Sequence, residues 1–340
     1  MKTCSLLAAA ALLLSIARMN PSLAGPITAK EAQRRAQVLE QLKKALAAET
    51  TDAARFTHIV RVLKGERAVD LRRQILDTAT KIPGPELEKF LTNYLTSEED
   101  AGLRSQAATT LGRMGSEKCL PTLAQVARND PTTRIEIGDV AGQSSARRAA
   151  TFAIAELAVR FPKLAGDAAA KLRALPVAEN AKDNEGLADA RVQALYQITR
   201  DDALLKPFYE RLKSKDARER QRGVNAFRFL KLKVAPAEIV NALKDPNAGV
   251  RRGSALVLGQ IGDPKTGPAL MTVAGDTKEE ASVRCNAIHA LGRMKIAGAA
   301  ALMEKLLTDP APSVQTNAAV ALYRITGKKV KEFPKGYRVD

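Results

Sequence analysis

The residues that most often carry catalysis or bind metals are scarce in this sequence. It contains two histidines, His58 and His289, and three cysteines among 340 residues. Neither histidine has a Cys, Asp or Glu neighbour at the spacing of a metal site. A glycine-rich phosphate loop, a nucleophile elbow and an H-E-x-x-H motif do not occur in the sequence. The sequence therefore predicts no catalytic, metal-binding or cofactor-binding residues.

Acidic residues are clustered where helices are expected to begin. The clusters are Glu98-Glu99-Asp100, Asp201-Asp202 and Glu279-Glu280. Carboxylates are favoured at helix N-termini because the helix dipole places partial positive charge there. We therefore interpret these clusters as structural rather than as acid–base pairs.

The helices expected around these residues are clearest in the stretch 245–274, which reads DPNAGVRRGSALVLGQIGDPKTGPALMTVA. Asp245 is suited to the N-cap and Pro246 to the first helical position. Apolar residues then recur at three- and four-residue steps up to Ile261, which predicts an amphipathic helix. Gly262 is suited to the left-handed C-terminal cap, and Pro268 begins a second, shorter helix. One such hairpin cannot bury its own apolar face, so it must stack on similar units.

Similar units are present along most of the chain. With Leu258 as the reference, the equivalent anchor positions are Ala79, Leu111, Ile154, Leu195, Phe227, Leu291 and Leu322. Their successive intervals are 32, 43, 41, 32, 31, 33 and 31 residues. A near-constant period of this size is typical of a helical solenoid. Seven residues before the anchor, six of the eight copies carry arginine: Arg72, Arg104, Arg147, Arg220, Arg251 and Arg284. The predicted fold is an all-α solenoid.

The repeat resembles the HEAT repeat, and especially the HEAT-like repeats of phycobilisome lyases. The residues that carry this resemblance are Asp245, Pro246, Val250, Arg251, Leu258, Gly259, Ile261, Gly262, Asp263, Pro268 and Leu270, with Val283, Arg284, Leu291, Gly292, Asp309, Pro310, Val314 and Leu322 in later copies. The resemblance implies a ladder in which an arginine near the middle of one first helix pairs with the aspartate that begins a neighbouring one. The expected ladder residues are Asp245, Arg251, Arg284 and Asp309.

The expected organisation has four parts. Residues 1–24 read as a signal peptide, and residues 25–64 as capping helices that begin with the Thr28 and Glu31 capping box. Residues 65–327 form the solenoid, with insertions near 131–145 and 176–186, and 328–340 form a basic tail. The tail is open to three interpretations: a flexible end, a cap over the last repeat, or an arm that binds polyanions.

The chain is strongly basic. Its net charge is +17, which falls to +15 when residues 1–24, with Lys2 and Arg18 and no acid, are removed. Such a charge raises the question of nucleic acid or another polyanion. The basic residues are spread along the chain, however, which is typical of a solvated surface. The exposed positions expected on the second helices carry one positive and two negative residues: Thr122, Gln125, Arg211, Glu238, Asn241, Thr272 and Glu304. A phosphate-binding groove is therefore not expected on that side.

No intramolecular disulfide is expected in the mature chain. Cys119 and Cys285 lie five repeats apart, and stacked helices are spaced by about 8–10 Å. A disulfide needs Cα atoms within about 7 Å, so the two cysteines cannot meet in a solenoid.

The sequence favours an exported, non-enzymatic scaffold or adaptor that binds a protein or peptide on a curved helical surface. The alternative is a binder of anionic envelope polymers or nucleic acid, and the family resemblance also leaves open a lyase-like factor. The partner-binding residues that we expect are Gln125, Arg134, Ile135, Glu136, Ile137, Asp139, Arg211 and Asn241. Insertions in solenoids often lie on the binding side, which is why the residues from 134 to 139 are included. We expect no cofactor and no membrane span in the mature chain.

The N-terminal residues predict export. Lys2 precedes the apolar run 6–16, and Ser22-Leu23-Ala24 places small residues where a signal peptidase reads them. N-terminal sequencing of the mature protein should therefore begin at Gly25. An intact Met1 on soluble protein would contradict this localisation, whereas an intact Met1 on membrane-bound protein would indicate an uncleaved anchor.

Overall fold

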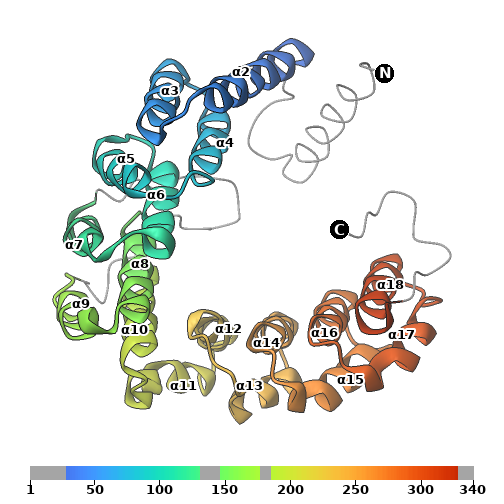
Figure 1. Cartoon of the computed structure of the whole chain (residues 1–340). Helices are drawn as coiled ribbons and strands as arrows, with labels where there is room; N and C mark the ends of the chain where they lie inside the picture. Colours follow the sequence, from blue (N-terminus) through green and yellow to red (C-terminus); the bar gives the residue numbers. More distant parts are fainter. Residues whose placement is uncertain (1–27, 131–145, 177–184, 328–340) are drawn as a thin grey trace. The chain divides into compact units, whose positions relative to one another are not determined.

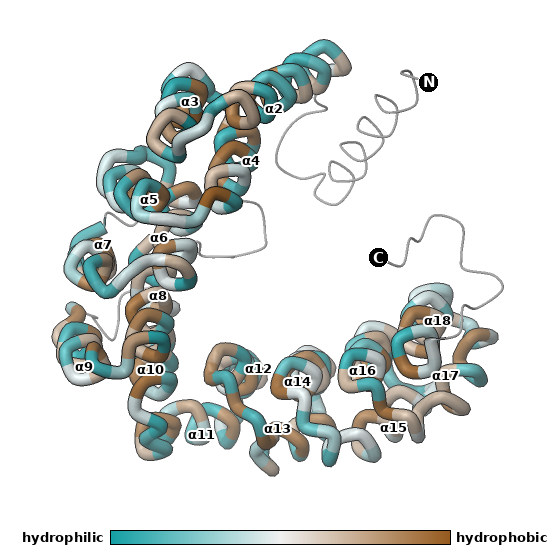
Figure 2. The backbone as a smooth tube through the Cα atoms, viewed as in Figure 1, coloured by the Kyte–Doolittle hydropathy of each residue, from teal (hydrophilic) through white to brown (hydrophobic). Residues whose placement is uncertain are grey.

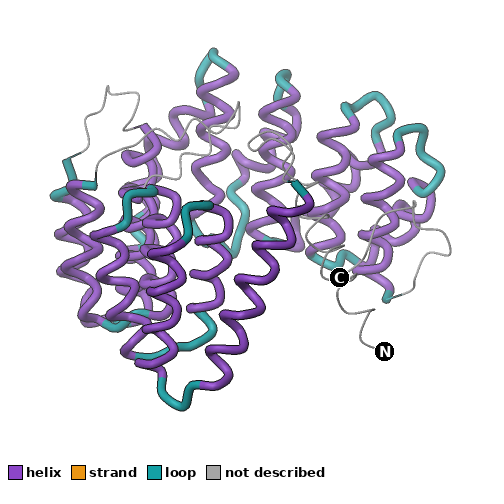
Figure 3. Tube along the Cα trace, turned by 90° about the horizontal axis from the view of Figure 1, so that it is seen from above, coloured by secondary structure: helices purple, strands orange, loops and turns teal. Residues whose placement is uncertain are grey.

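A computed structural model describes residues 28–130, 146–176 and 185–327. These residues form α-helices, short 3-10 helices and loops, and no strand occurs among them (Figure 3). The chain divides into two compact units, which meet in sequence between Thr199 and Arg200. The prediction of an all-α solenoid is confirmed.

Unit 1 contains helices α2 to α10 (Figure 1). Their bounds are α2 Ala29–Ala48, α3 Asp52–Gly65, α4 Val69–Ala79, α5 Pro85–Ser97, α6 Ala101–Met114, α7 Leu120–Asn129, α8 Ala146–Arg160, α9 Ala165–Arg173 and α10 Glu185–Thr199. Among the first helices of this unit, α4 packs on α6, α6 on α8 and α8 on α10. The second helices α5, α7 and α9 lie beside them, so each repeat is a helical hairpin.

Unit 2 continues the same arrangement in α11 to α18. The bounds are α11 Lys206–Leu212, α12 Ala217–Ala226, α13 Ala237–Asn241, α14 Ala248–Ile261, α15 Gly267–Gly275, α16 Ala281–Arg293, α17 Ala300–Leu306 and α18 Pro312–Thr326. The first helices α12, α14, α16 and α18 form one row, and α13, α15 and α17 form a second row (Figure 1).

The eight anchor positions are all buried in the interior of their repeats. Leu258, Leu291 and Ile154 have no exposed surface, and the most exposed anchor, Leu322, retains 7%. Burial of apolar side chains at a fixed period therefore holds the stack together.

Glycines next to the anchors let consecutive first helices approach closely. A Cβ atom added to Gly259 would lie 2.7 Å from Cβ of Ala290 on the next first helix. The same addition to Gly292 would lie 2.8 Å from Cα of Ala321. In unit 1, a Cβ on Gly112 would lie 2.6 Å from Cα of Ala153. Side chains larger than glycine at these positions would force the helices apart.

Helix α14 begins two residues later than the sequence suggested. Its N-cap is Asn247, whose side chain accepts a hydrogen bond from the amide of Val250. Asp245 is therefore not the cap, and it takes another role that is described below. The C-terminal cap is Gly262 with φ +76°, as predicted for a left-handed cap.

The first helix of the described chain is mostly hydrophilic. Figure 2 shows mainly polar residues along α2, and Leu42 is its only buried residue. The expected N-cap is present, because Thr28 accepts a hydrogen bond from the amide of Glu31. A helix with one apolar edge is suited to the end of a stack, where one side faces water.

Several sequence-based predictions lie outside the described residues. These concern the signal peptide, the insertion 131–145, most of the insertion 176–186, and the basic tail 328–340. No helix of the described residues is long and apolar enough to cross a membrane.

Replacing Leu258 by Ala should cost roughly 2–5 kcal/mol of the free energy of unfolding, because the side chain is fully buried. Denaturant unfolding followed by circular dichroism measures this cost. The matched control is Val234→Ala, because Val234 is 68% exposed and should change stability by less than about 0.5 kcal/mol. Equal costs at the two positions would contradict the repeat alignment.

Candidate functional site

The most regular polar feature is a ladder of ion pairs between successive repeats, which we call the arginine ladder. Each pair joins the arginine seven residues before an anchor to an acid farther along the chain. Four of these acids lie two or three residues before the next first helix, and the fifth, Asp130, is the C-cap of α7. The pairs are Arg72–Glu98, Arg104–Asp130, Arg220–Asp245, Arg251–Glu279 and Arg284–Asp309. In the Arg220 and Arg251 pairs the shortest nitrogen–oxygen distances are 2.7 and 2.6 Å.

Three ladder arginines, Arg104, Arg220 and Arg251, also hold the loop in front of their own helix. The Arg251 guanidinium donates to the carbonyl oxygens of Asp245 and Pro246 at 2.7 and 3.1 Å. Arg220 does the same with Ser214 and Lys215, both at 3.0 Å. Asp245 thus accepts from Arg220 through its carboxylate and from Arg251 through its backbone. The ladder therefore fixes the register of consecutive repeats.

The ladder lowers the pKa of its carboxyl groups. Hydrogen bonds from Arg284 hold the pKa of Asp309 below its usual value, and Arg220 has the same effect on Asp245. Arg251 lowers the pKa of Glu279 in the same way. Fully paired arginines and carboxylates of this kind serve structure, since neither partner is available for a substrate.

Two acidic clusters have a role that the sequence analysis missed. Glu98 is 7% exposed and pairs with Arg72, and Glu279 pairs with Arg251. Glu98 and Glu279 therefore form ion pairs of the arginine ladder, in addition to any favourable interaction with the helix dipole. Arg147 is the exception among the six arginines, because its guanidinium donates to the carbonyl oxygens of Ala127 and Pro176.

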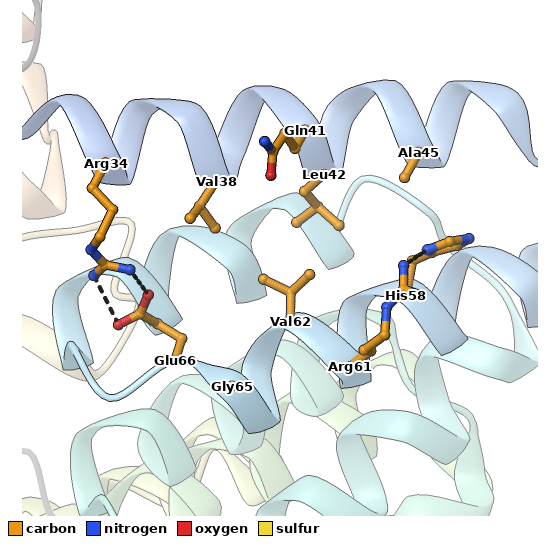
Figure 4. Close-up of a pocket in the computed structure, with 10 residues that line it drawn as sticks. All are labelled: Arg34, Val38, Gln41, Leu42, Ala45, His58, Arg61, Val62, Gly65 and Glu66. Carbon is orange, nitrogen blue, oxygen red and sulfur yellow. Dashed lines mark hydrogen bonds and ion pairs between the residues drawn. The ribbon is translucent and has the colours of Figure 1, made fainter.

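An open cavity of about 360 Å³ lies between α2 and α3 (Figure 4). Its lining combines the apolar Val38, Leu42 and Val62 with charged groups at the two ends. At one end Arg34 forms two hydrogen bonds with the Glu66 carboxylate. At the other end His58 lies beside Arg61 (Figure 4).

Both nitrogens of the His58 ring are occupied. Arg61 donates to Nδ1 at 2.5 Å, so the ring proton lies on Nε2, which donates to Glu49 at 2.7 Å. A metal ligand needs a free lone pair on one ring nitrogen, and this arrangement leaves none. The His58 group is therefore a hydrogen-bonded connection between α2 and α3.

The second histidine has a different environment. His289 lies on α16, and its pKa is lowered by partial desolvation among its neighbours and by the positive charges of Arg324 and Arg293. It belongs to unit 2, whereas His58 belongs to unit 1. Among the described residues no three His, Cys, Asp or Glu side chains are grouped as a metal ion would require.

The two cysteines of the described chain are free thiols in different units. Cys119 is buried, and burial raises the pKa of its thiol to about 12. The reactive form of cysteine is the thiolate, so this side chain is inert at neutral pH.

The expected partner-binding residues do not form one cluster within a unit. Gln125 is exposed on α7 in unit 1, and Asn241 is exposed on α13 in unit 2. Arg211 is half-buried, with its guanidinium 5.7 Å from the centre of the Phe208 ring. The other members, Arg134, Ile135, Glu136, Ile137 and Asp139, lie outside the described residues.

Stacked helical hairpins linked by an arginine ladder define an α-solenoid of the HEAT type. The sequence profile of the family "HEAT repeats" matches residues 56–138, 205–280 and 276–333, which is more than half of the chain. The chain belongs to this family.

Two curated relatives extend over most of the chain. Deoxyhypusine hydroxylase of Candida albicans is 26% identical over 250 residues, which are 70% of this chain and 67% of that protein. Deoxyhypusine hydroxylase-B of Oryza sativa subsp. japonica is 29% identical over 244 residues, which are 66% of this chain and 79% of that protein. The comparison with a solved structure of human deoxyhypusine hydroxylase in complex with glycerol covers 89% of this chain and 100% of that chain, at 17% identity and a TM-score of 0.34.

These relatives contradict the prediction of a non-enzymatic scaffold, adaptor or polyanion binder. Both are named as enzymes, and each similarity covers about two thirds of this chain. The prediction failed because it relied on the absence of catalytic motifs in one chain. The sequence pattern of the repeats reflects helix packing, so it does not reveal that relatives of the chain are enzymes.

The ladder predicts a defined pH dependence of stability. Because the pKa of Asp309 is lower in the folded state, its contribution is complete above about pH 4 and is lost as the pH falls through the folded-state pKa. Asp309→Asn should therefore lower the melting temperature at pH 7, and the difference from the unmodified chain should shrink in acid. Asp202→Asn is the control, because Asp202 is exposed and should have little effect at either pH. A constant difference for Asp309→Asn across this range would argue against the pairing.

Proposed function

We propose that this chain is an enzyme that hydroxylates a side chain of a protein substrate. The observation that carries the proposal is the similarity to two deoxyhypusine hydroxylases over 66–70% of this chain. The arginine ladder and the buried anchors supply a rigid repeated framework, and frameworks of this kind present extended surfaces to macromolecules.

Hydroxylation requires an oxidising centre, which proteins usually supply as a metal or an organic cofactor. A common protein-bound form is an iron held by two histidines and a carboxylate. The described residues do not fit such a centre. Both ring nitrogens of His58 are hydrogen-bonded, His289 stands among arginines, and the described residues contain no group of three candidate ligands. The role proposed for the described part of the chain is therefore to bind the protein substrate.

We propose in addition that the protein acts after export. Support comes from Lys2, the apolar run 6–16 and Ser22-Leu23-Ala24, which together have the pattern of a cleavable secretory signal.

The reaction can be tested directly. The purified mature chain is incubated in air with a deoxyhypusine-containing protein, ferrous iron and a reductant, and the substrate is examined by mass spectrometry. We expect the addition of one oxygen atom at the modified residue. The Candida albicans relative serves as the positive control, and the chain without added iron as the comparison. Failure of this chain to add oxygen while the Candida albicans protein does so would contradict the proposal.

A further inference from the structure

The first helices α14, α16 and α18 carry arginines that the ladder does not use. Their sequences contain no Asp or Glu, and they contain Arg251, Arg252, Arg284, Arg293 and Arg324. Arg251 and Arg284 are neutralised by Glu279 and Asp309 in the ladder. The remaining three are exposed, and within residues 200–327 no ion pair is formed by their guanidinium groups.

These three arginines lie on the exposed row of first helices in unit 2. The row is continuous, because α14 packs on α16 and α16 packs on α18 (Figure 1). Asn286 of α16 donates to the backbone oxygen of Arg252 on α14 at 3.1 Å. Besides desolvation, the positive charges of Arg324 and Arg293 lower the pKa of His289 on α16. Arginines of both α16 and α18 therefore act on the same side chain. We call Arg252, His289, Arg293 and Arg324 the cationic face.

A second observation extends the cationic face toward α12. Arg228, which follows α12, is exposed, and its Nε donates to the Gln260 side chain of α14 at 3.3 Å. Gln260, Arg293 and Arg324 each lie two residues after the anchor of their repeat. The basic and amide side chains therefore recur with the stacking period.

The opposite row has a different charge pattern. Its helices α13 and α17 carry the exposed acids Glu238 and Glu304. Lys305 lies on α17 beside Glu304, and the connecting segments that carry Lys265 and Lys278 also contain acids. The excess of positive charge in unit 2 is thus concentrated on the first helices.

We propose that the cationic face binds an acidic segment of the protein substrate. Arginine binds carboxylates through two parallel hydrogen bonds, and the three uncommitted guanidinium groups are free to do so. The amides of Gln260 and Asn286 add neutral hydrogen-bonding groups between them. This inference rests on the proposed function, because the acidic segment is assigned to the substrate of the hydroxylation.

The spacing of the uncommitted arginines favours a protein over a nucleic acid as the ligand of the cationic face. The face provides about one uncommitted arginine per repeat, and neighbouring helices are about 8–10 Å apart. Double-stranded DNA carries one charge for about every 1.7 Å of its axis, which calls for a denser row of basic groups. Single strands bind by stacking on aromatic rings, whereas Tyr323 is the one aromatic residue among α14, α16 and α18 and is half-buried.

The test compares two variants with the same change in charge. In the first, Arg252, Arg293 and Arg324 are each replaced by Glu; in the second, Lys265, Lys278 and Lys305 are each replaced by Glu. The probe is a fluorescein-labelled peptide of alternating glutamate and glycine, and its Kd is measured by fluorescence anisotropy at low and physiological salt. Circular dichroism checks that both variants remain folded.

We expect the arginine variant to raise the Kd of the acidic peptide by roughly tenfold or more, and the lysine variant by less than about threefold. Equal effects of the two variants, or no effect of either, would overturn the assignment. Tighter binding of single-stranded DNA of equal charge, with the same dependence on the three arginines, would overturn it in favour of a nucleic acid.

The two proposals fail in different ways. If the chain binds the acidic peptide through the three arginines but adds no oxygen, the proposed function is contradicted and the binding role of the cationic face is supported. If oxygen is added and the arginine variant leaves the KM for the protein substrate unchanged, the binding role of the cationic face is contradicted and the proposed function is supported.

Discussion

The close approach of consecutive first helices is the constraint on which the rest of the structure depends. Gly112, Gly259 and Gly292 each meet the backbone or Cβ of an alanine in the next repeat, at distances that leave no room for a side chain. This contact fixes the spacing between repeats. At that spacing the arginine of one repeat reaches the acid of the next, and the anchors become buried. Packing therefore comes first, and the ladder depends on it.

The same constraint explains why the charged residues divide into two groups. An arginine seven residues before the anchor is directed toward the start of the next repeat, where it is neutralised. Arg252, Arg293 and Arg324 lie at other positions of α14, α16 and α18, and they take part in none of the ion pairs within residues 200–327, so their charge remains available. Neighbouring arginines such as Arg251 and Arg252 consequently have different roles. A repeated framework thus produces a charged surface with the period of the stack.

The sequence was sufficient for the fold because packing is what the repeat encodes. The period, the buried anchors and the cap at Gly262 all follow from local patterns of apolar residues and glycine. Local patterns could not identify the cap of α14, because Asp245 is as good a cap in sequence as Asn247. Only the neighbouring repeat, through Arg220, shows that Asp245 belongs to the ladder. The cationic face was missed for the same reason, although the recurrence of basic residues two positions after the anchor was a signal that could have indicated it. The similarity to enzymes could not be predicted from motifs, because the described residues contain no group of candidate metal ligands that would have indicated catalysis.

Contact between glycine and alanine thus sets the spacing of the repeats. The most direct measurement is the melting temperature of Gly292→Ala beside that of Gly298→Ala. Gly292 faces Ala321 at contact distance, whereas a Cβ on Gly298 would have no atom within 4 Å. Helix propensity alone favours alanine over glycine, so a packing effect must overcome it at Gly292. The account predicts a melting temperature lower by at least about 3 °C for Gly292→Ala and little change for Gly298→Ala. An unchanged or raised melting temperature for Gly292→Ala would contradict it.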